Sequence, residues 1–536
     1  MEERIRQAIG RDVTIRRPAP AFGDYAVFGG AEADAFAQRL KHELGDSVEK
    51  VEVVKGFVNV TLSREAVRFA VAEADAKGEA WGTGVLEEGK RVMVEYTDPN
   101  PFKEMHIGHL MSNTIGESLA RLIGNEGAEV VRANYQGDVG PHVAKALWGL
   151  CEKGITEPAT AKELGEAYAE GARAYEESPK ARAEIDALNT EVYKGVDLSR
   201  RSALTEGDHA LMELWRKGRD VSLAAFEELY RILGTRFDYY FFESETAEPG
   251  MRAVRDGVAK GIFEESEGAV IYRGEKIGLH TLVFITSRGT PTYEAKDIGL
   301  AFLKEERASA DRSIIITAAE QTGHFKVLLA ALSEIAPLIA KKTVHVPHGL
   351  LRLTTGKMGS RTGNVITAAG FIKEIIEKAS EKNPDPLIAE QVALGAIKYM
   401  ILRQAPGSDI VFDPEKSLSL EGDSGPYLQY ALVRARKILA YGDNGEGGTE
   451  IPTEPYAIER LILHYPEVVE RSARELAPNL LVNYLTELAS AWNSFYATEQ
   501  VLGSREEAYK QRLTRAFAHT MTNGLSLLGI PAPDRM

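Results

Sequence analysis

The chain has 536 residues, more than one hydrophobic core usually organises, so we expect three or four domains. Its 64 Lys and Arg residues against 79 Asp and Glu residues give a net charge of −15, which excludes a histone-like protein but leaves room for a local basic face. An apolar content of 44% excludes a disordered chain, and the single cysteine, Cys151, excludes an internal disulfide and a cysteine-cluster zinc site.

The first twenty residues and the apolar stretches of the chain favour a cytoplasmic protein. Residues 1–20 are charged throughout and contain no apolar core of a secretory signal. The longest apolar stretch, residues 327–340, is interrupted by Ser333 and Glu334 and is too short to span a bilayer. We therefore expect a cytoplasmic protein without a membrane segment.

Residues 1–85 have the pattern of a small α/β domain. Residues 31–44 place apolar side chains on one side of a helix, and residues 51–62 alternate around Gly56 as two paired strands. The pattern changes at residue 91, where a strand (91–96), a proline-rich loop, a helix from about residue 108 and a second strand (129–134) follow one another. This order is typical of the start of a doubly wound parallel sheet.

The middle of the chain is predicted to continue that sheet around a helical insertion. Residues 151–230 are rich in Ala, Glu, Lys and Arg and indicate inserted helices. The sheet is then expected to resume with the strands 239–242, 269–272, 281–285, 313–317 and 344–346.

The last part of the chain is predicted to be all-α. Helical patterns cover residues 427–439, 457–468, 478–496 and 506–528, which indicates a C-terminal helical bundle. The predicted fold class is therefore α/β, with a Rossmann-type doubly wound parallel domain between a small α/β domain and an all-α bundle. The predicted boundaries are 1–85, 86–345, 346–419 and 420–536.

The strongest local signal is His106-Ile107-Gly108-His109, at a helix start directly after a strand and a proline loop. Backbone N–H groups and the helix dipole attract anions at a helix N-terminus. Two imidazoles can donate hydrogen bonds to a phosphate, and Gly108 lets a flat purine ring approach the backbone. The motif predicts a nucleotide phosphate site, with two surface histidines near a helix cap as the alternative.

A second signal is the polar loop Lys357-Met358-Gly359-Ser360-Arg361-Thr362-Gly363-Asn364. Its two cations suit a loop that closes over a triphosphate, although a solvated basic loop would have the same composition.

Together the two signals resemble the HIGH and KMSKS signatures of class I aminoacyl-tRNA synthetases, in the right order. Further segments resemble the arginyl-tRNA synthetases in particular, and they reach from the first motif to the last residue. These segments are 95–103 (EYTDPNPFK), 293–297 (YEAKD), 320–324 (EQTGH), 425–431 (GPYLQYA) and 527–536 (LLGIPAPDRM).

Two positions depart from the family pattern. Ser360 stands where KMSKS has its second lysine, and arginyl enzymes often lack that lysine; Lys103 is the position thought to compensate for it. Met111 stands where the family often has an arginine after HIGH, which leaves the contacts at that point open.

The resemblance implies an arginine–tRNA ligase that uses ATP. His106, Gly108, His109, His324, Lys357 and Met358 would bind ATP, and Lys103 and Lys357 would neutralise the charge that develops towards pyrophosphate. Mg²⁺ would accompany ATP, but no carboxylate cluster in the sequence defines a metal site of the protein itself.

A physical argument also supports an arginine pocket in this sequence. A guanidinium needs a carboxylate that accepts two parallel hydrogen bonds. Tyr293 and Asp297, four residues apart, share one face of a helix, and no oppositely charged residue stands at helical spacing from Asp297 to pair with it. By resemblance Gln321 joins this pocket, while Glu95 and Asn100 contact the polar groups of the amino acid.

Contacts with tRNA are implied at both ends of the chain. Phe57 and Asn59 match a segment that arginyl enzymes use on the D-loop, although a Phe in a strand is as readily a core residue. Arg434, Tyr496 and Met536 resemble part of the anticodon-binding region, and Trp492 in the same region is expected to be a packing residue.

We therefore predict an arginyl-tRNA synthetase that acts as a monomer on tRNA(Arg). One alternative is another class I synthetase, for a lysyl or cysteinyl substrate, although the lack of a zinc-type cluster argues against the cysteinyl one. The other is a catalytically silent tRNA-binding relative, against which both histidines of the first motif and Lys357 argue.

Overall fold

The computed structural model describes residues 1–196, 205–354, 366–441 and 448–536. Contacts between residues divide the chain into two compact units. The larger unit is Glu87–Ser417, and the smaller unit joins Met1–Leu86 to Leu418–Met536.

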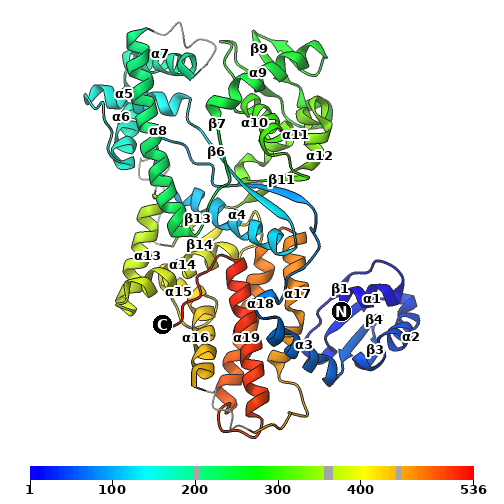
Figure 1. The fold of residues 1–536 in the computed structure, drawn as a ribbon. Helices are drawn as coiled ribbons and strands as arrows, with labels where there is room; N and C mark the ends of the chain where they lie inside the picture. The colour runs from blue at the N-terminus through cyan, green and yellow to red at the C-terminus, as the bar shows by residue number, and fades with distance from the viewer. Residues whose placement is uncertain (197–204, 355–365, 442–447) are drawn as a thin grey trace. The chain divides into compact units, whose positions relative to one another are not determined.

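The larger unit is built on a five-stranded sheet whose strands are all parallel (Figure 1). The strand order is β12-β11-β5-β6-β7. The strands are β5 (Arg91–Glu95), β6 (Glu129–Gln136), β7 (Tyr239–Phe242), β11 (Arg312–Ala318) and β12 (Thr343–His348). From β5 the chain turns to β6 on one side, and β11 lies on the other, so the strand order reverses between β5 and β11.

Helices cover this sheet and extend beyond its carboxyl end. Figure 1 shows α5–α8 as one group and α9–α12 as another. The helices of this unit are α4 (Ile107–Asn125), α5 (Pro141–Glu152), α6 (Ala161–Glu177), α7 (Pro179–Val196), α8 (Glu206–Leu233), α9 (Glu243–Ala259), α10 (Tyr293–Ala308), α11 (Thr322–Ile335), α12 (Pro337–Lys342), α13 (Ala368–Lys382), α14 (Pro386–Leu402) and α15 (Pro414–Ser417).

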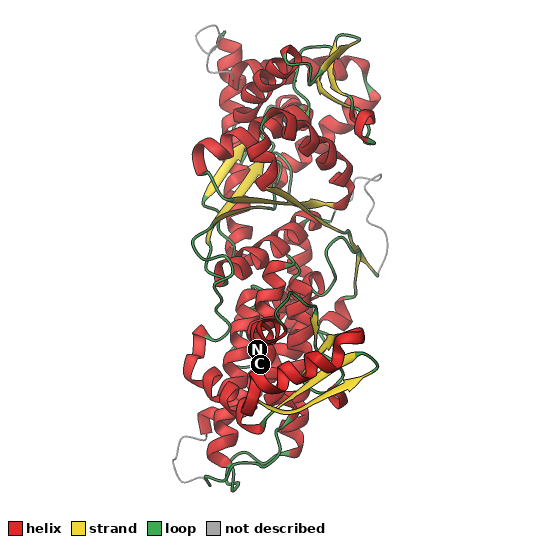
Figure 2. Cartoon of the chain, turned by 90° about the vertical axis from the view of Figure 1, so that its right-hand side faces the viewer, coloured by secondary structure: helices red, strands yellow, loops and turns green. Residues whose placement is uncertain are grey.

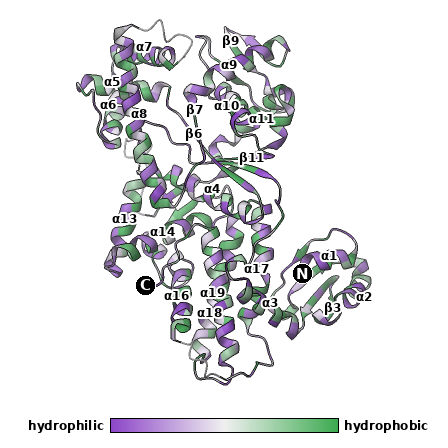
Figure 3. Ribbon diagram, in the orientation of Figure 1, coloured by the Kyte–Doolittle hydropathy of each residue, from purple (hydrophilic) through white to green (hydrophobic). Residues whose placement is uncertain are grey.

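The central strands are apolar because both faces of the sheet are covered. Val92 and Val94 on β5 and Ile314 on β11 are fully buried, and Figure 3 shows strands of this sheet in green. Helix α4 packs closely on the end of β5, where Gly116 lies against Tyr96, the residue after the strand. A Cβ atom added to Gly116 would stand only 2.2 Å from Cγ of Tyr96, so a larger residue would not fit there. The sequence prediction of a doubly wound parallel sheet with a helical insertion is therefore confirmed.

Two predicted strands belong to a different sheet. β9 (Ala269–Tyr272) and β10 (Leu282–Ile285) pair antiparallel with each other, and β8 (Glu264–Ser266) completes a separate three-stranded sheet. Their apolar pattern identified them as strands but did not specify their partners. A further short pair joins β13 (Leu351–Leu353) and β14 (Ile410–Phe412) in parallel.

The smaller unit begins with a four-stranded antiparallel sheet in the order β1-β2-β4-β3, drawn in yellow with helices beside it in Figure 2. Its strands are β1 (Ile15–Arg16), β2 (Tyr25–Phe28), β3 (Val48–Val54) and β4 (Phe57–Leu62), and its helices are α1 (Glu2–Ile9), α2 (Ala33–Leu44) and α3 (Arg64–Lys77). Helices α1 and α2 share one apolar core with the sheet.

The rest of the smaller unit is helical, as predicted. It consists of α16 (Gly425–Tyr441), α17 (Ala457–Arg474), α18 (Pro478–Thr498) and α19 (Glu507–Leu527). Trp492 is fully buried and its ring stacks on Phe517 at 4.4 Å between centroids, so it packs in the core as expected. Arg64 on α3 forms an ion pair of 2.5 Å with the buried Glu459 on α17 and fixes this bundle to the first domain.

Within the described residues, no helix has both the length and the apolar character needed to cross a membrane.

Candidate active site

The histidines of the first motif form the N-terminal cap of α4. His106 is the N-cap residue, and its Nδ1 accepts a hydrogen bond of 3.1 Å from the N–H of Gly108. The N–H of His106 in turn donates to Nδ1 of His109 at 3.1 Å. The two rings stack with centroids 3.8 Å apart. This reciprocal cap holds both side chains in one orientation at the start of the helix.

The cap also fixes where the protons of the two imidazoles lie. In each ring Nδ1 accepts a hydrogen bond, so the proton of the neutral ring is on Nε2. Partial burial and the nearby Lys103 lower the pKa of His106, and burial together with His106 and Lys103 lowers the pKa of His109 further. At neutral pH the site therefore has two neutral Nε2–H donors, which suits a phosphate oxygen beside a lysine.

The loop between β5 and α4 has a strained backbone. Thr97, Asp98 and Phe102 have φ angles of 79°, 47° and 65°, in a region that residues other than glycine rarely adopt. Such strain costs roughly 1–3 kcal/mol per residue and is retained where the surroundings enforce it. Here Ser112 Oγ accepts from the N–H of Thr97 at 2.9 Å, and Ser222 Oγ on α8 accepts from the N–H of Phe102 at 2.9 Å.

Lys103 lies in this loop between the histidines and the helical insertion. Its Nζ stands 4.3 Å from the centre of the Tyr168 ring on α6. Burial lowers the pKa of His142 on α5 to about 3, and the charge of Lys103 adds to that shift. Lys103 lies near His106 and His109, since its charge adds to the effect of burial in lowering their pKa values, and its ammonium group lies over the ring of Tyr168.

The segment that leads out of the second motif lies against the first. His106 and Thr367 form an antiparallel bridge, the N–H of Ile107 donates to the carbonyl of Ile366 at 3.3 Å, and the N–H of Ala368 donates to the carbonyl of Met105 at 2.7 Å. Lys357, Met358 and Ser360 themselves lie outside the described residues. Their predicted roles stay predictions.

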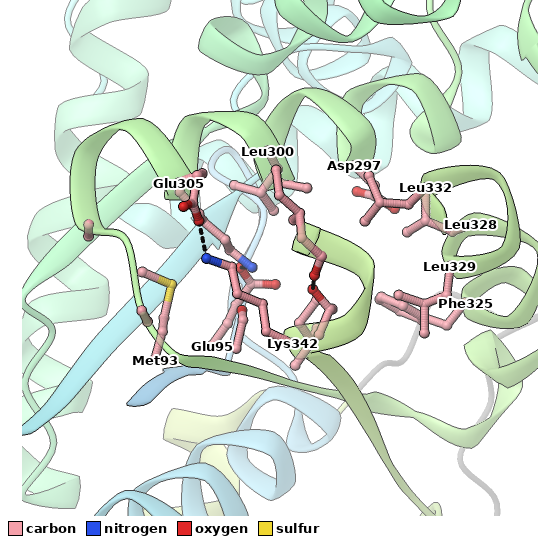
Figure 4. A pocket seen from close by; sticks show the side chains of 18 residues that line it. Met93, Glu95, Asp297, Leu300, Glu305, Phe325, Leu328, Leu329, Leu332 and Lys342 are labelled. Atoms are coloured by element: carbon pink, nitrogen blue, oxygen red, sulfur yellow. Dashed lines mark hydrogen bonds and ion pairs between the residues drawn. The ribbon is translucent and has the colours of Figure 1, made fainter. Parts of the chain in front are cut away.

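A small cavity of about 40 Å³ lies against β5 and β11, where the strand order reverses. Figure 4 shows Glu95, from the end of β5, and Asp297, from α10, among the side chains that line it. Crevices at such reversal points are the usual ligand sites of open α/β sheets. Glu95 is 3% exposed and forms an ion pair with the buried Lys304. Burial raises the pKa of Glu95, although Lys304 opposes that shift.

Asp297 has a partner that the sequence did not reveal. Nε2 of His324, on α11, lies 2.7 Å from Oδ2 of Asp297, and Nδ1 of the same ring lies 3.4 Å from Oε1 of Glu294. The expectation that Asp297 lacks a partner along its own helix holds, but a residue distant in sequence pairs with it. His324, predicted for ATP, is thus placed against the residue predicted for arginine.

The other residues predicted for arginine lie on three different segments. Tyr293 begins α10, with Nζ of Lys296 4.4 Å from the centre of its ring. The side chain of Asn100 lies against Gly137, the residue after β6. A Cβ atom added to Gly137 would stand only 2.1 Å from Oδ1 of Asn100. Gln321, in the 3₁₀ turn Ala319–Gln321 before α11, is exposed.

Acidic residues that sequence reasoning missed lie near Asp297 without lining the cavity. Glu243, at the start of α9, is buried and forms an ion pair with the buried Lys296. Burial raises the pKa of Asp98, and the neighbouring charge of Glu95 adds to that shift. The two acids after β7, Glu243 and Glu245, gave no local sign that the side chain of Glu243 turns inward. Among the described residues no group of three potential metal ligands is present.

The residues predicted to contact tRNA lie in the smaller unit. Phe57 and Asn59 follow one another on β4; Asn59 is 8% exposed, and the ring of Phe57 packs against Phe28. Arg434 donates to Oδ1 of Asn493 at 2.9 Å, and its guanidinium lies 5.0 Å from the centre of the Tyr496 ring. Met536, the last residue, is half-buried. The contacts of these residues with tRNA stay predictions.

Comparison with known proteins agrees with the fold and the motifs. The model for class I tRNA synthetases (R), catalytic domain, matches residues 74–413, and the DALR anticodon binding domain matches residues 428–536. An arginine–tRNA ligase of Porphyromonas gingivalis is 30% identical over 91% of this chain and 88% of its own length, and one of Clostridium beijerinckii is 29% identical over 97% and 95%.

A solved structure agrees as well. The arginyl-tRNA synthetase of Thermus thermophilus superposes with a TM-score of 0.82 and 27% identity, over 100% of this chain and 99% of its own. The reversed sheet, the histidine cap at its carboxyl end and these matches lead to one conclusion: the chain belongs to the arginyl branch of the class I aminoacyl-tRNA synthetases.

Proposed function

We propose that the protein activates L-arginine with ATP and transfers it to the 3′-terminal adenosine of tRNA(Arg). The observation that carries this proposal is the position of Asp297 and Glu95, two carboxylates that line one cavity at the reversal point of the sheet. Arginine has two cationic ends, a guanidinium and an ammonium. Asp297 would take the guanidinium through paired hydrogen bonds, with Tyr293 and Gln321 beside it, and Glu95 and Asn100 would take the polar end.

ATP would bind beside this pocket, because the segment from Glu95 to His109 leads directly from the cavity to the start of α4. The Nε2–H groups of His106 and His109 would donate to phosphate oxygens, and Gly108 would allow close approach of the purine. Lys103 and Lys357 would neutralise the charge that grows on the leaving pyrophosphate. His324 and Met358 complete the residues expected to contact ATP.

The reaction needs positioning and charge stabilisation from the protein. The carboxylate of arginine attacks the α-phosphorus of ATP in line, which gives arginyl-adenylate and releases pyrophosphate. A ribose hydroxyl of the terminal adenosine of tRNA then attacks the arginyl carbonyl, and AMP leaves. Because no protein nucleophile forms a covalent intermediate, the rate depends on orientation and on donors aimed at the developing charge.

We propose further that Mg²⁺ enters with ATP, bound to its phosphates. The residues Phe57, Asn59, Arg434, Tyr496 and Met536 would contact tRNA, in the N-terminal domain (1–85) and the anticodon-binding domain (420–536). The predicted divisions 86–345 and 346–419 would hold the catalytic sheet and the stem contacts. The enzyme would act as a monomer in the cytoplasm.

The direct test of activation is ATP–pyrophosphate exchange with each of the twenty amino acids, with and without total tRNA. The proposal predicts exchange that depends on arginine alone. Exchange with lysine or cysteine would favour another class I specificity, and no exchange under either condition would favour a silent tRNA-binding relative.

A further inference from the structure

His324 bridges two carboxylates on one face of α10. Its Nε2 lies 2.7 Å from Oδ2 of Asp297, and its Nδ1 lies 3.4 Å from Oε1 of Glu294. The three side chains are 20%, 18% and 15% exposed, so water screens these contacts only in part. The first contact engages the oxygen of Asp297 that a guanidinium would need.

Both ring nitrogens face acceptors, which requires that both carry a proton. The ring is then an imidazolium. Burial alone would lower the pKa of His324, but the hydrogen bonds and charges of Asp297 and Glu294 outweigh it and raise the pKa to about 10. The contact is thus an ion pair at neutral pH, in which the histidine supplies the positive charge that arginine would otherwise bring.

Other titratable groups face this pair from neighbouring elements. Asp98, in the loop after β5, and Glu243, on α9, have pKa values raised mainly by burial, and the charge of Asp297 adds to both shifts. Glu95, from β5, is already paired with Lys304. His345, from β12, donates to or accepts from Thr317 Oγ1 at 2.8 Å, and burial next to the charge of His324 lowers its pKa to about 4, so it stays neutral. His280 approaches α11 from the loop before β10, and its Cε1 would stand 3.2 Å from a Cβ atom added to Gly323.

We infer that His324 is the counter-ion of Asp297 while the arginine pocket is empty, and that the guanidinium of arginine displaces it. This inference rests on the proposed function. The exchange is balanced in charge: one guanidinium cation enters, the imidazole loses both carboxylate contacts, and its proton passes to the solvent. His324 is therefore a positioning residue of the arginine site, because it keeps the partly buried carboxylate of Asp297 paired between catalytic cycles.

The exchange makes arginine binding depend on pH with a defined sign. An imidazole in solution has a pKa of about 6.5, so a displaced ring loses its proton above that value. Binding of arginine then releases a proton at any pH between about 6.5 and about 10, the pKa of His324 while it is paired with Asp297 in the empty pocket. Within that window the affinity for arginine increases with pH, by up to about tenfold per unit, and below it the affinity is independent of this group.

The test is calorimetry of L-arginine binding to the full-length protein, in phosphate and in Tris buffers, at pH 5.5, 7 and 8. The number of protons released follows from the difference in heat between the buffers. The wild type is expected to release close to one proton per arginine at pH 8 and almost none at pH 5.5. His324→Gln, which keeps a hydrogen-bond donor without the charge, is expected to release none and to bind with a flat pH profile.

A matched control is His280→Gln, the same change on a neighbouring histidine outside the pair, which is expected to behave as the wild type. Arginine that binds to the wild type at pH 8 without releasing a proton would show that His324 stays in place, and would overturn the inference while leaving the proposed function intact. If arginine failed to bind to any of the three proteins, the proposed pocket itself would be wrong, and the inference with it.

Discussion

Replacing Asp297 with Asn tests the arginine pocket most sharply. The amide keeps the size of the carboxylate and its place on α10, but it removes the negative charge and one of the two acceptors that a guanidinium needs. We expect weaker binding of arginine and unchanged binding of ATP, because no residue predicted for ATP except His324 contacts Asp297 in the described structure.

The size of the loss follows from two opposing effects. Removing one partner of a buried ion pair costs about 3–5 kcal/mol, and the lower value applies because Asp297 is 18% exposed. The wild type must first break the pair of Asp297 with His324, and a partly exposed pair of this kind contributes up to about 1 kcal/mol. The net loss is therefore about 2 kcal/mol, or roughly 30-fold in the dissociation constant of arginine.

The assay is calorimetry with arginine and, separately, with ATP, together with the KM for arginine in tRNA charging. Glu306→Gln is the matched control, since it makes the same kind of charge change at an exposed residue of α10 that does not line the cavity. An Asp297→Asn variant whose arginine KM stayed within twofold of the wild type would refute the assignment of this pocket.

Four further outcomes are expected. Lys103→Ala should lower kcat far more than it raises the KM for ATP, and Ser360→Lys in that background should recover part of the rate; purely additive kinetics would show that the two positions do not share a task. Pyrophosphate exchange with arginine should require tRNA, and robust exchange without it would reject this dependence. Glu467 accepts a hydrogen bond of 2.9 Å from Tyr25 Oη; burial would raise its pKa, but contacts such as that with His464 outweigh burial and lower the pKa to about 2. Glu467→Gln should therefore reduce Tm at pH 7, by an amount that shrinks as the pH falls from about 4.5 towards 2. An equal Tm difference at pH 7 and at pH 2 would contradict this. Trp492→Ala should lower the free energy of unfolding by about 3–5 kcal/mol in a urea titration, because the ring is fully buried, and a loss below 1 kcal/mol would contradict that core position.

Local patterns in the sequence predicted most of the fold. The strand of Val92 and Val94, the helix after His106 and the four C-terminal helices each have a periodicity that decides their structure. The sheet membership of β9 and β10 could not be predicted in this way, because an apolar alternation says that a segment pairs and does not say with what. The four predicted domain boundaries remain predictions.

At the site, sequence identified side chains more readily than contacts. The motif at residues 106–109 predicted a helix start with a phosphate site; the helix starts there, the two histidines form its cap, and the phosphate site stays a prediction. The pair of Asp297 and His324 joins two helices, and the positive φ of Thr97 falls on a residue type that gives no sign of it. Both features depend on tertiary packing, which holds a strained loop and buried charges against their local preference.

The most direct test of the central claim is aminoacylation itself. Purified protein, ATP, Mg²⁺ and total tRNA are incubated with each radiolabelled amino acid in turn, and acid-precipitable label is measured. The account predicts that arginine alone is attached to tRNA, and that Asp297→Asn requires far more arginine to reach the same rate. Charging with a different amino acid, or arginine charging that is indifferent to Asp297, would contradict it.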